Sequence, residues 1–93
     1  MPTKLTEPEI VERTRKAAEW ERKGEELVRA FKFGDFKQAM SFVNKVAGEA
    51  EAMDHHPDIL IQYSRVRLTL STHSAGGLTD LDFQLAQKIN RLS

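Results

Sequence analysis

Residues 35–57 read DFKQAMSFVNKVAGEAEAMDHHP, and the rest of the fold can be placed from this stretch. Asp35 is of a residue type that caps helix N-termini, and Gln38 stands three positions later, where a capping box has its second polar side chain. Apolar residues then recur at steps of three and four, as on the buried face of a helix. These residues are Phe36, Ala39, Met40, Val43, Val46, Ala47 and Ala50. The stretch therefore predicts an amphipathic helix that packs against a core.

This helix is expected to end near Asp54 or His55, because Pro57 disfavours helical backbone at the residue before it. The chain then continues as an extended segment. His55 and His56 therefore lie at the junction between a helix and a strand, and such junctions often carry binding or catalytic side chains.

Two β-hairpins are predicted, one on each side of this helix. The first joins residues 19–22 to residues 25–33 through a turn at Lys23-Gly24, and the second has a two-residue turn at Ser64-Arg65. The register of the second hairpin places apolar residues opposite one another on one face. The expected pairs are Tyr63 with Val66, Ile61 with Leu68 and Ile59 with Leu70. The polar face ends at His73, which we expect to terminate the fourth strand.

Two further helices begin with capping boxes, one formed by Thr6 and Glu9 and the other by Thr79 and Asp82. The element order is then α-β-β-α-β-β-α. It predicts an α+β two-layer sandwich, in which three helices cover one face of a four-stranded antiparallel sheet, with residues 1–93 as a single domain. A small core and a sheet with one uncovered face also predict a homo-oligomer.

The composition of the 93 residues excludes several classes of protein. The absence of cysteine rules out disulfides, thiolate zinc sites and a cysteine nucleophile. The 14 Lys and Arg residues balance the 14 Asp and Glu residues, which argues against a basic surface for nucleic acid. No apolar run approaches the roughly 18 residues of a membrane span, and residues 1–12 lack the apolar core of a signal peptide. We therefore expect a cytoplasmic protein that binds neither nucleic acid nor a membrane.

The candidate site lies in residues 51–58, where two imidazoles and three acids follow one another closely. Glu51 and His55 are four positions apart, so on a helix the carboxylate would face the ring and hold its tautomer. The second hairpin would bring His73 back beside His56. Three imidazoles are therefore expected to converge, which suits acid–base chemistry.

Each of these side chains also has an ordinary structural explanation. His55 can compensate a helix dipole, His56 can be a solvated turn residue, and His73 can simply end a strand. Glu51 can be an exposed acid in the last helical turn, and Asp82 can act only as a helix cap. A metal site is the rival chemical interpretation, but adjacent histidines diverge by about 100° on a helix and no HExxH spacing occurs. We expect no bound metal.

The sequence resembles the pterin-4a-carbinolamine dehydratases, and the resemblance extends from Trp20 to Asp82. The segment Phe31-Lys32-Phe33-Gly34-Asp35-Phe36 and the element order resemble that family as well. The residues that match its signature are Glu51, His55-His56-Pro57, Tyr63, Ser71-Thr72-His73, Gly77-Leu78 and Asp82.

The resemblance implies a hydro-lyase that dehydrates 4a-hydroxytetrahydrobiopterin to quinonoid dihydrobiopterin. This reaction belongs to the recycling of tetrahydrobiopterin after aromatic amino-acid hydroxylation, so a link to a hydroxylase pathway is implied. The family assembles as homodimers or homotetramers and needs neither a metal nor a redox cofactor. Animal relatives also act as dimerisation cofactors of a transcription factor through a helical surface, so a non-catalytic interaction module or transcriptional coactivator is the alternative.

The resemblance also assigns roles to the site residues. It implies that His55 and His73 are the acid and base, and that His56 binds and positions the pterin. Glu51, Asp54, Asp82, Ser71 and Thr72 are implied to contact or support the pterin. Ser74 departs from the family, because many relatives have an acid at this position, and such an acid could orient His73.

Overall fold

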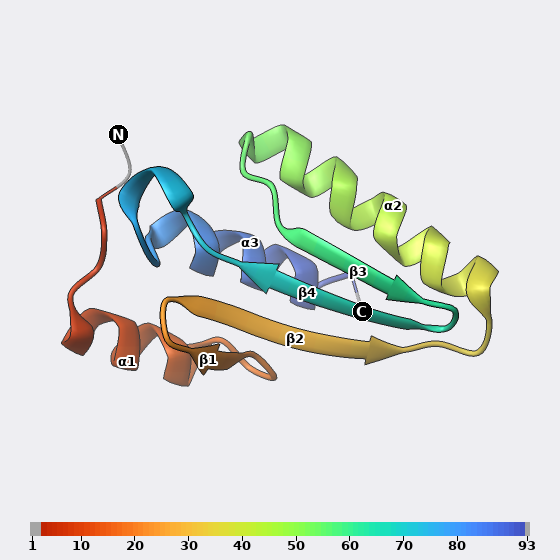
Figure 1. Cartoon of the computed structure of the whole chain (residues 1–93), viewed down its shortest axis with the longest axis horizontal. Coiled ribbons are helices and arrows are strands. Elements are labelled where there is room, and N and C mark those ends of the chain that lie inside the picture. Colours follow the sequence, from red (N-terminus) through yellow and green to blue (C-terminus); the bar gives the residue numbers. More distant parts are fainter. Residues whose placement is uncertain (1–2, 93) are drawn as a thin grey trace.

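The chain folds into an antiparallel sheet with helices packed against it (Figure 1). The computed structural model describes residues 3–92. The elements are α1 (Glu7–Lys16), β1 (Glu21–Lys23), β2 (Glu26–Lys32), α2 (Phe36–Met53), β3 (Asp58–Gln62), β4 (Arg65–Leu70), a short 3₁₀ helix η1 (His73–Ala75) and α3 (Asp80–Asn90). The strand order is β1-β2-β4-β3, and all neighbouring strands are antiparallel. The predicted α+β class and the predicted order of helices and strands are confirmed.

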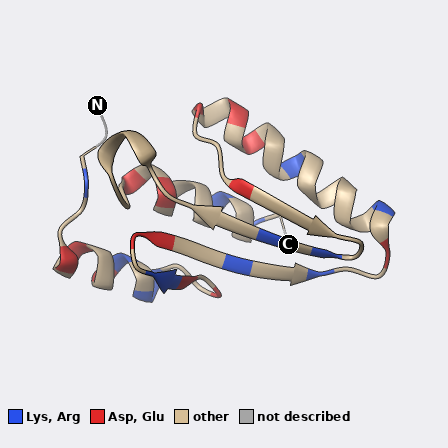
Figure 2. Ribbon diagram, viewed as in Figure 1, with Lys and Arg blue, Asp and Glu red and all other residues tan. Residues whose placement is uncertain are grey.

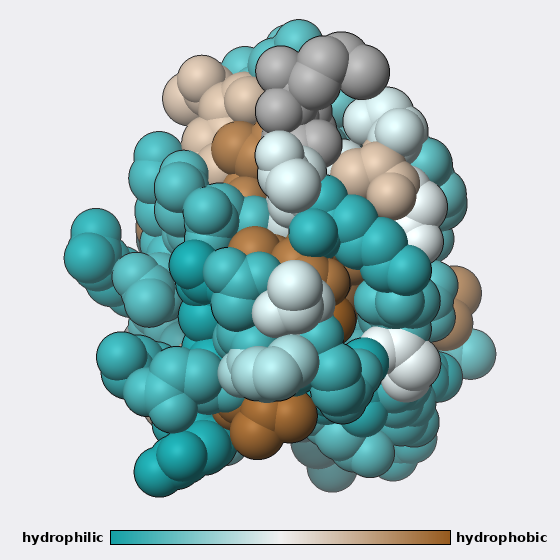
Figure 3. All heavy atoms as spheres, turned by 90° about the vertical axis from the view of Figure 1, so that its left-hand side faces the viewer, coloured by the Kyte–Doolittle hydropathy of each residue, from teal (hydrophilic) through white to brown (hydrophobic). Residues whose placement is uncertain are grey.

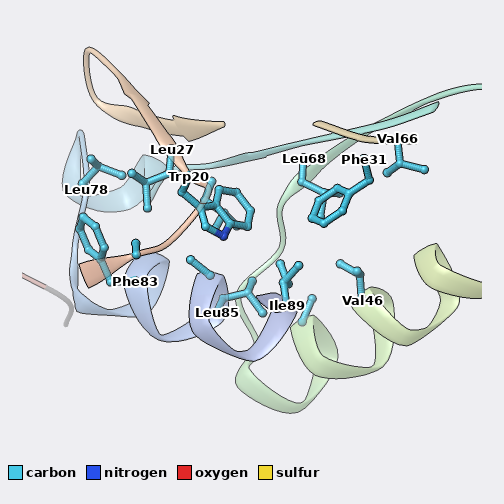
Figure 4. Close-up of a cluster of buried hydrophobic side chains, with 14 of the residues drawn as sticks. Trp20, Leu27, Phe31, Val46, Val66, Leu68, Leu78, Phe83, Leu85 and Ile89 are labelled. Carbon is cyan, nitrogen blue, oxygen red and sulfur yellow. The ribbon is translucent and has the colours of Figure 1, made fainter. Parts of the chain in front are cut away.

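One hydrophobic core lies between the sheet and the helices (Figure 4). In β2 and β4 every second residue faces this core, as the period of a strand requires. The core side chains of the strands are Leu27, Phe31, Val66, Leu68 and Leu70, and they meet Val46 of α2 and Leu85 and Ile89 of α3. Helix α1 contributes Ile10, which is 1% exposed. The core therefore joins all three helices to one face of the sheet.

The three predicted N-terminal caps are present. Thr6 and Glu9 form a complete capping box at α1, and Thr79 and Asp82 form one at α3. At α2 the Asp35 side chain accepts a hydrogen bond from the Gln38 backbone N–H at 2.8 Å. The Gln38 side chain differs from the prediction, because it accepts from the backbone N–H of Gly34 instead of returning to the cap.

The register of the second hairpin differs from the prediction by two positions. The turn consists of Tyr63 and Ser64, and Tyr63 adopts the positive φ, 55°, that a primed hairpin turn has at its first central residue. The observed pairs include Ile61 with Val66 and Ile59 with Leu68. A shift of two leaves each side chain that remains in the two strands on its predicted face, so the apolar alternation could not distinguish the two registers. Tyr63 itself leaves the apolar face and is 68% exposed.

The first hairpin is also displaced, by one residue. Lys23 pairs with Glu26, so the turn consists of Gly24 and Glu25, with Gly24 at φ 60°. Strand β1 begins only at Glu21. The turn is displaced because Gly24 occupies its first central position, where a positive φ is needed.

For two residues of α2 the prediction of burial in the core is wrong. Phe36 is 50% exposed and Ala47 is exposed as well. Phe36 is the first residue of the helix, where the chain has only begun to turn toward the core. The interior positions of the stripe agree with the prediction, since Ala39 and Val46 are both fully buried.

Charged side chains of both signs are distributed along the helices and the strands (Figure 2). This arrangement agrees with the overall balance of 14 basic and 14 acidic residues. Across residues 3–92, none of the helices combines the length and the apolar character needed to span a membrane.

Val46→Ala is expected to lower the free energy of unfolding by about 2 kcal/mol, because it removes two buried methyl groups and leaves a cavity. Val11→Ala is the matched control, since Val11 also lies in a helix but is 47% exposed. Urea titration followed by circular dichroism measures both variants. Equal losses in the two variants would contradict the assignment of α2 to the core.

Candidate active site

Helix α2 ends in a Schellman motif that sends its two following histidines in different directions. Asp54 adopts a left-handed conformation with φ 51° and ψ 43°, and its N–H donates to the carbonyl of Glu51. The N–H of His55 donates to the carbonyl of Ala50 at 3.0 Å. These two hydrogen bonds are the pair that defines the motif. Asp is one of the few residue types besides Gly that adopts this conformation readily.

His55 turns inward and meets Asp82 of α3. Its Nε2 lies 2.6 Å from Oδ1 of Asp82, and the two residues are 8% and 0% exposed. An ionised carboxylate can only accept hydrogen bonds, so Nε2 of His55 carries the proton in this pair. Nδ1 is then the ring atom of the neutral imidazole that can accept a proton.

The second oxygen of the Asp82 carboxylate is also engaged. Oδ2 accepts hydrogen bonds from the Thr72 hydroxyl at 2.8 Å and from the Thr79 N–H at 3.0 Å. The hydroxyl oxygens of Thr72 and Thr79 are 2.8 Å apart. Since the Thr72 proton points to Asp82, the Thr79 hydroxyl donates to Thr72. The carboxylate therefore receives three hydrogen bonds in a site that solvent does not reach.

The predicted capping role of Asp82 is thus confirmed, and the same carboxylate also holds His55. The two roles do not exclude each other because each uses a different oxygen. The Thr79 hydroxyl caps α3 by accepting from the N–H of Leu81 at 3.3 Å. One carboxylate therefore joins the start of α3 to the end of α2.

The predicted pairing of Glu51 with His55 is wrong. Glu51 instead pairs with His56, whose Nε2 lies 2.5 Å from Oε1 of the carboxylate. The side chains are 76% and 56% exposed, so this pair lies on the surface. The spacing rule for helices fails here because the left-handed Asp54 ends the helix before His55.

The prediction that His73 ends the fourth strand is wrong. Strand β4 stops at Leu70, and His73 is exposed at the start of η1. Thr72 makes an isolated antiparallel bridge with Gly77, which turns the chain out of the sheet. Thr72 is also the residue that donates to Asp82, so His73 directly follows a member of the buried network around His55.

The remaining predicted residues occupy different positions around this network. Asp54 and Ser74 are exposed, and Ser71 is half-buried. The Ser71 hydroxyl donates to the backbone carbonyl of Glu25 at 2.8 Å. The hydrogen bond between the hydroxyls of Thr72 and Thr79 was not predicted from the sequence. The capping motif already explained Thr79, and no other feature of the sequence pointed to this contact.

The histidines and acids do not form a metal-binding group. Within residues 3–92, no set of three or more His, Asp or Glu side chains is arranged to hold an ion. His55 and His56 diverge, because one points to Asp82 in the interior and the other to Glu51 at the surface. The arrangement supplies imidazole and carboxylate groups that can transfer protons.

Comparison with known proteins identifies the family of this chain. A family model described as "Pterin 4 alpha carbinolamine dehydratase" matches residues 3–92. A relative from Sulfurisphaera tokodaii, named "Putative pterin-4-alpha-carbinolamine dehydratase", is 51% identical over 89 residues and covers 96% of both chains. A relative of the same name from Picosynechococcus is 47% identical over 92 residues, which is 99% of this chain and all of the relative.

A solved structure is similar over almost the whole chain. The crystal structure of a transcriptional coactivator/pterin dehydratase from Brucella melitensis has a TM-score of 0.92 and 41% sequence identity. The match covers 97% of this chain and 98% of the Brucella chain. The chain belongs to the pterin-4-alpha-carbinolamine dehydratase family.

A double-mutant cycle tests the buried pair. Asp82→Ala is expected to lower the free energy of unfolding by about 3 kcal/mol, because it leaves buried donors without an acceptor. Thr79→Ala, which removes a cap, should cost about 1 kcal/mol. Combining Asp82→Ala with His55→Ala should show a coupling of about 0.5–3 kcal/mol in urea unfolding. Additive losses would show that His55 and Asp82 do not interact in solution.

Proposed function

We propose that this chain catalyses the dehydration of 4a-hydroxytetrahydrobiopterin to quinonoid dihydrobiopterin. The observation that carries the proposal is the buried hydrogen bond between His55 and Asp82, in a chain of the dehydratase family. The relatives are named for the same reaction. A surface histidine, His56, follows immediately in the chain and is available to a ligand.

The reaction requires two proton transfers and no change in oxidation state. The bond between C4a and its hydroxyl oxygen breaks, and a proton delivered to that oxygen lets it leave as water. The proton on N5 is removed, and the electron pair of the N5–H bond forms the C4a–N5 double bond. General acid–base groups on the two sides of the ring supply these steps, and histidine suits both because it exchanges protons near neutral pH.

We assign these two transfers to His55 and His73. The Asp82 carboxylate holds the His55 ring in one orientation and leaves Nδ1 as its proton acceptor. His73 is exposed at the start of η1, directly after Thr72 of the buried network, where a substrate can reach it. His56, held by Glu51 at the surface, is assigned to binding and positioning the pterin ring.

The other predicted contacts divide into two groups. The hydroxyl of Thr72 already donates to Asp82, so we assign Thr72 and Asp82 to holding His55 in place. Asp54 is exposed beside the histidines, and Ser71 is half-buried next to Thr72. We keep Asp54 and Ser71 as contacts of the bound pterin.

His55→Ala and His73→Ala are each expected to lower the dehydration rate by about 10²-fold, the usual contribution of a positioned acid or base. Stopped-flow absorbance of freshly formed carbinolamine measures the rate, with the spontaneous reaction subtracted. Asn44→Ala, at an exposed position of α2, is the control and should retain the wild-type rate. Wild-type rates in both histidine variants would exclude the acid–base assignment.

The same assay is expected to give an unchanged rate after exhaustive chelation, because neither proton transfer needs a Lewis acid. Activity that disappears on chelation and returns with one equivalent of a divalent ion would contradict this mechanism.

We further propose that the protein is a homo-oligomer. Strand β3 lies at the edge of the sheet, and its unpaired side leaves backbone groups available to another strand. Near this edge lie large apolar side chains that a monomer would leave in water. They are Ile59, Leu60 and Tyr63, with 36%, 49% and 68% exposure.

Light scattering is expected to give a mass of at least two chains at micromolar concentration. Leu60→Lys should shift the protein toward the monomer, because a lysine on an edge strand opposes pairing. Val11→Lys is the control, since Val11 is 47% exposed on α1 and does not belong to strand β3. A wild-type protein that is monomeric under these conditions would rule out the oligomer.

A second candidate is a non-catalytic role as a dimerisation cofactor or transcriptional coactivator. It is supported by the similarity to the Brucella protein, which is described as a transcriptional coactivator as well as a pterin dehydratase. The double variant His55→Ala, His73→Ala separates the two functions. An interaction role would survive in this variant, whereas dehydration would not.

A further inference from the structure

Residues 72–77 form a small closed loop that carries His73. The N–H of Thr72 donates to the carbonyl of Gly77 at 3.0 Å, and the N–H of Gly77 returns to the carbonyl of Thr72 at 3.3 Å. Inside the loop, the N–H of Gly76 donates to the carbonyl of His73 at 3.1 Å. The position of His73 therefore depends on what holds the two ends of the loop.

One end of the loop is held by the buried network, through Thr72 and Asp82. The remaining contacts of the loop come from the turn between β1 and β2 and from the segment before α1. Both lie at the same end of the molecule as η1 (Figure 1). Leu27 pairs with Leu70 at the end of the β2–β4 ladder, so this turn lies beside the chain that leaves β4. Figure 3 shows this end of the molecule as a mainly hydrophilic surface.

Glu25, in that turn, makes contacts through both its backbone and its side chain. Its carbonyl accepts from the Ser71 hydroxyl at 2.8 Å. Its Oε2 forms an ion pair with Nζ of Lys4 at 3.0 Å, and this ammonium group lowers the pKa of the Glu25 carboxyl. The N–H of Leu5, next to Lys4, donates to the carbonyl of Leu78 at 2.9 Å. Ser71 and Leu78, which flank the loop, are thus hydrogen-bonded to the backbone of Glu25 and of Leu5, the neighbour of Lys4.

Gly77 shows how closely the ion pair packs against the loop. A Cβ atom at Gly77 would lie 2.8 Å from Oε1 of Glu25 and 2.8 Å from Cε of Lys4. Both distances are shorter than carbon can approach without displacing the neighbour. The absence of a side chain at Gly77 therefore lets the ends of the Glu25 and Lys4 side chains pack directly against the loop.

We propose that Glu25, with Lys4, is a positioning residue, which holds the 72–77 loop so that His73 stands where a bound substrate needs it. The inference rests on the proposed dehydratase function, because it assigns a role in that reaction to residues outside the histidine–acid site. Glu25 touches neither His73 nor a substrate. Its carboxylate packs against Gly77 at one end of the loop, and its backbone carbonyl holds Ser71, which precedes the other end.

The test compares Glu25→Gln with Glu12→Gln. Glu12 also forms exposed ion pairs, with Arg15 and Lys16, but these lie on α1 and have no contact with the loop. Glu25→Gln is expected to lower kcat about fivefold with KM for the pterin unchanged, since an exposed ion pair has a modest effect. Glu12→Gln should change neither constant.

Amide hydrogen exchange supplies a readout that is independent of activity. The N–H of Gly76 should exchange about fivefold faster in Glu25→Gln, because the loop opens more often. The charge-reversed double variant Lys4→Glu, Glu25→Lys restores the ion pair and should recover kcat and the slow exchange.

The outcomes separate the inference from the proposed function. Unchanged kcat or unchanged Gly76 exchange in Glu25→Gln, or no recovery in the charge-reversed variant, would overturn the positioning role while the wild-type enzyme remains active. A wild-type protein without dehydratase activity would instead overturn the proposed function itself.

Discussion

The buried carboxylate of Asp82 is the constraint on which the site and much of the surrounding chain depend. A charged group with 0% exposure is costly unless donors surround it. Its three donors come from three parts of the chain, namely His55 after α2, Thr72 after β4 and Thr79 before α3. Satisfying one carboxylate thus fixes the end of one helix, the start of another and the exit of a central strand. The same contacts place an oriented imidazole at the surface of the core.

Around this constraint the rest of the fold provides rigid support. Leu78 and Leu85 on either side of Asp82 are fully buried, so α3 cannot move without disturbing the core. The Schellman motif at Asp54 turns His55 inward and leaves His56 at the surface. An inward histidine held by a carboxylate and an outward histidine open to a ligand are therefore products of one helix end. This division suits the proposed roles of His55 in proton transfer and of His56 in binding.

Much of this could be predicted from the sequence, because caps and periodicity are local signals. The caps at Thr6, Asp35 and Thr79 and the end of α2 before Pro57 all agree with the structure. The second hairpin lacked a glycine or asparagine in its turn, and its alternation is the same after a shift of two residues. Its faces could therefore be predicted but its register could not.

The partner of His55 could not be predicted from spacing either, because Asp82 lies 27 residues away. Helical spacing pointed to Glu51, and the rule was inapplicable because the left-handed Asp54 intervenes. The cap motif explained Asp82 by itself, so nothing in the sequence indicated that its other oxygen was free for a histidine. These two residues are brought together by tertiary packing, which no local sequence pattern reports.

The central claim is that Asp82 fixes the tautomer of His55. Long-range ¹H–¹⁵N NMR of the imidazole rings measures this directly in the neutral form of the protein. The structure predicts that His55 carries its proton on Nε2, with Nδ1 unprotonated, and that His56 and His73 give separate spectra. A neutral His55 protonated on Nδ1, or one that averages both tautomers as an exposed histidine does, would contradict the account.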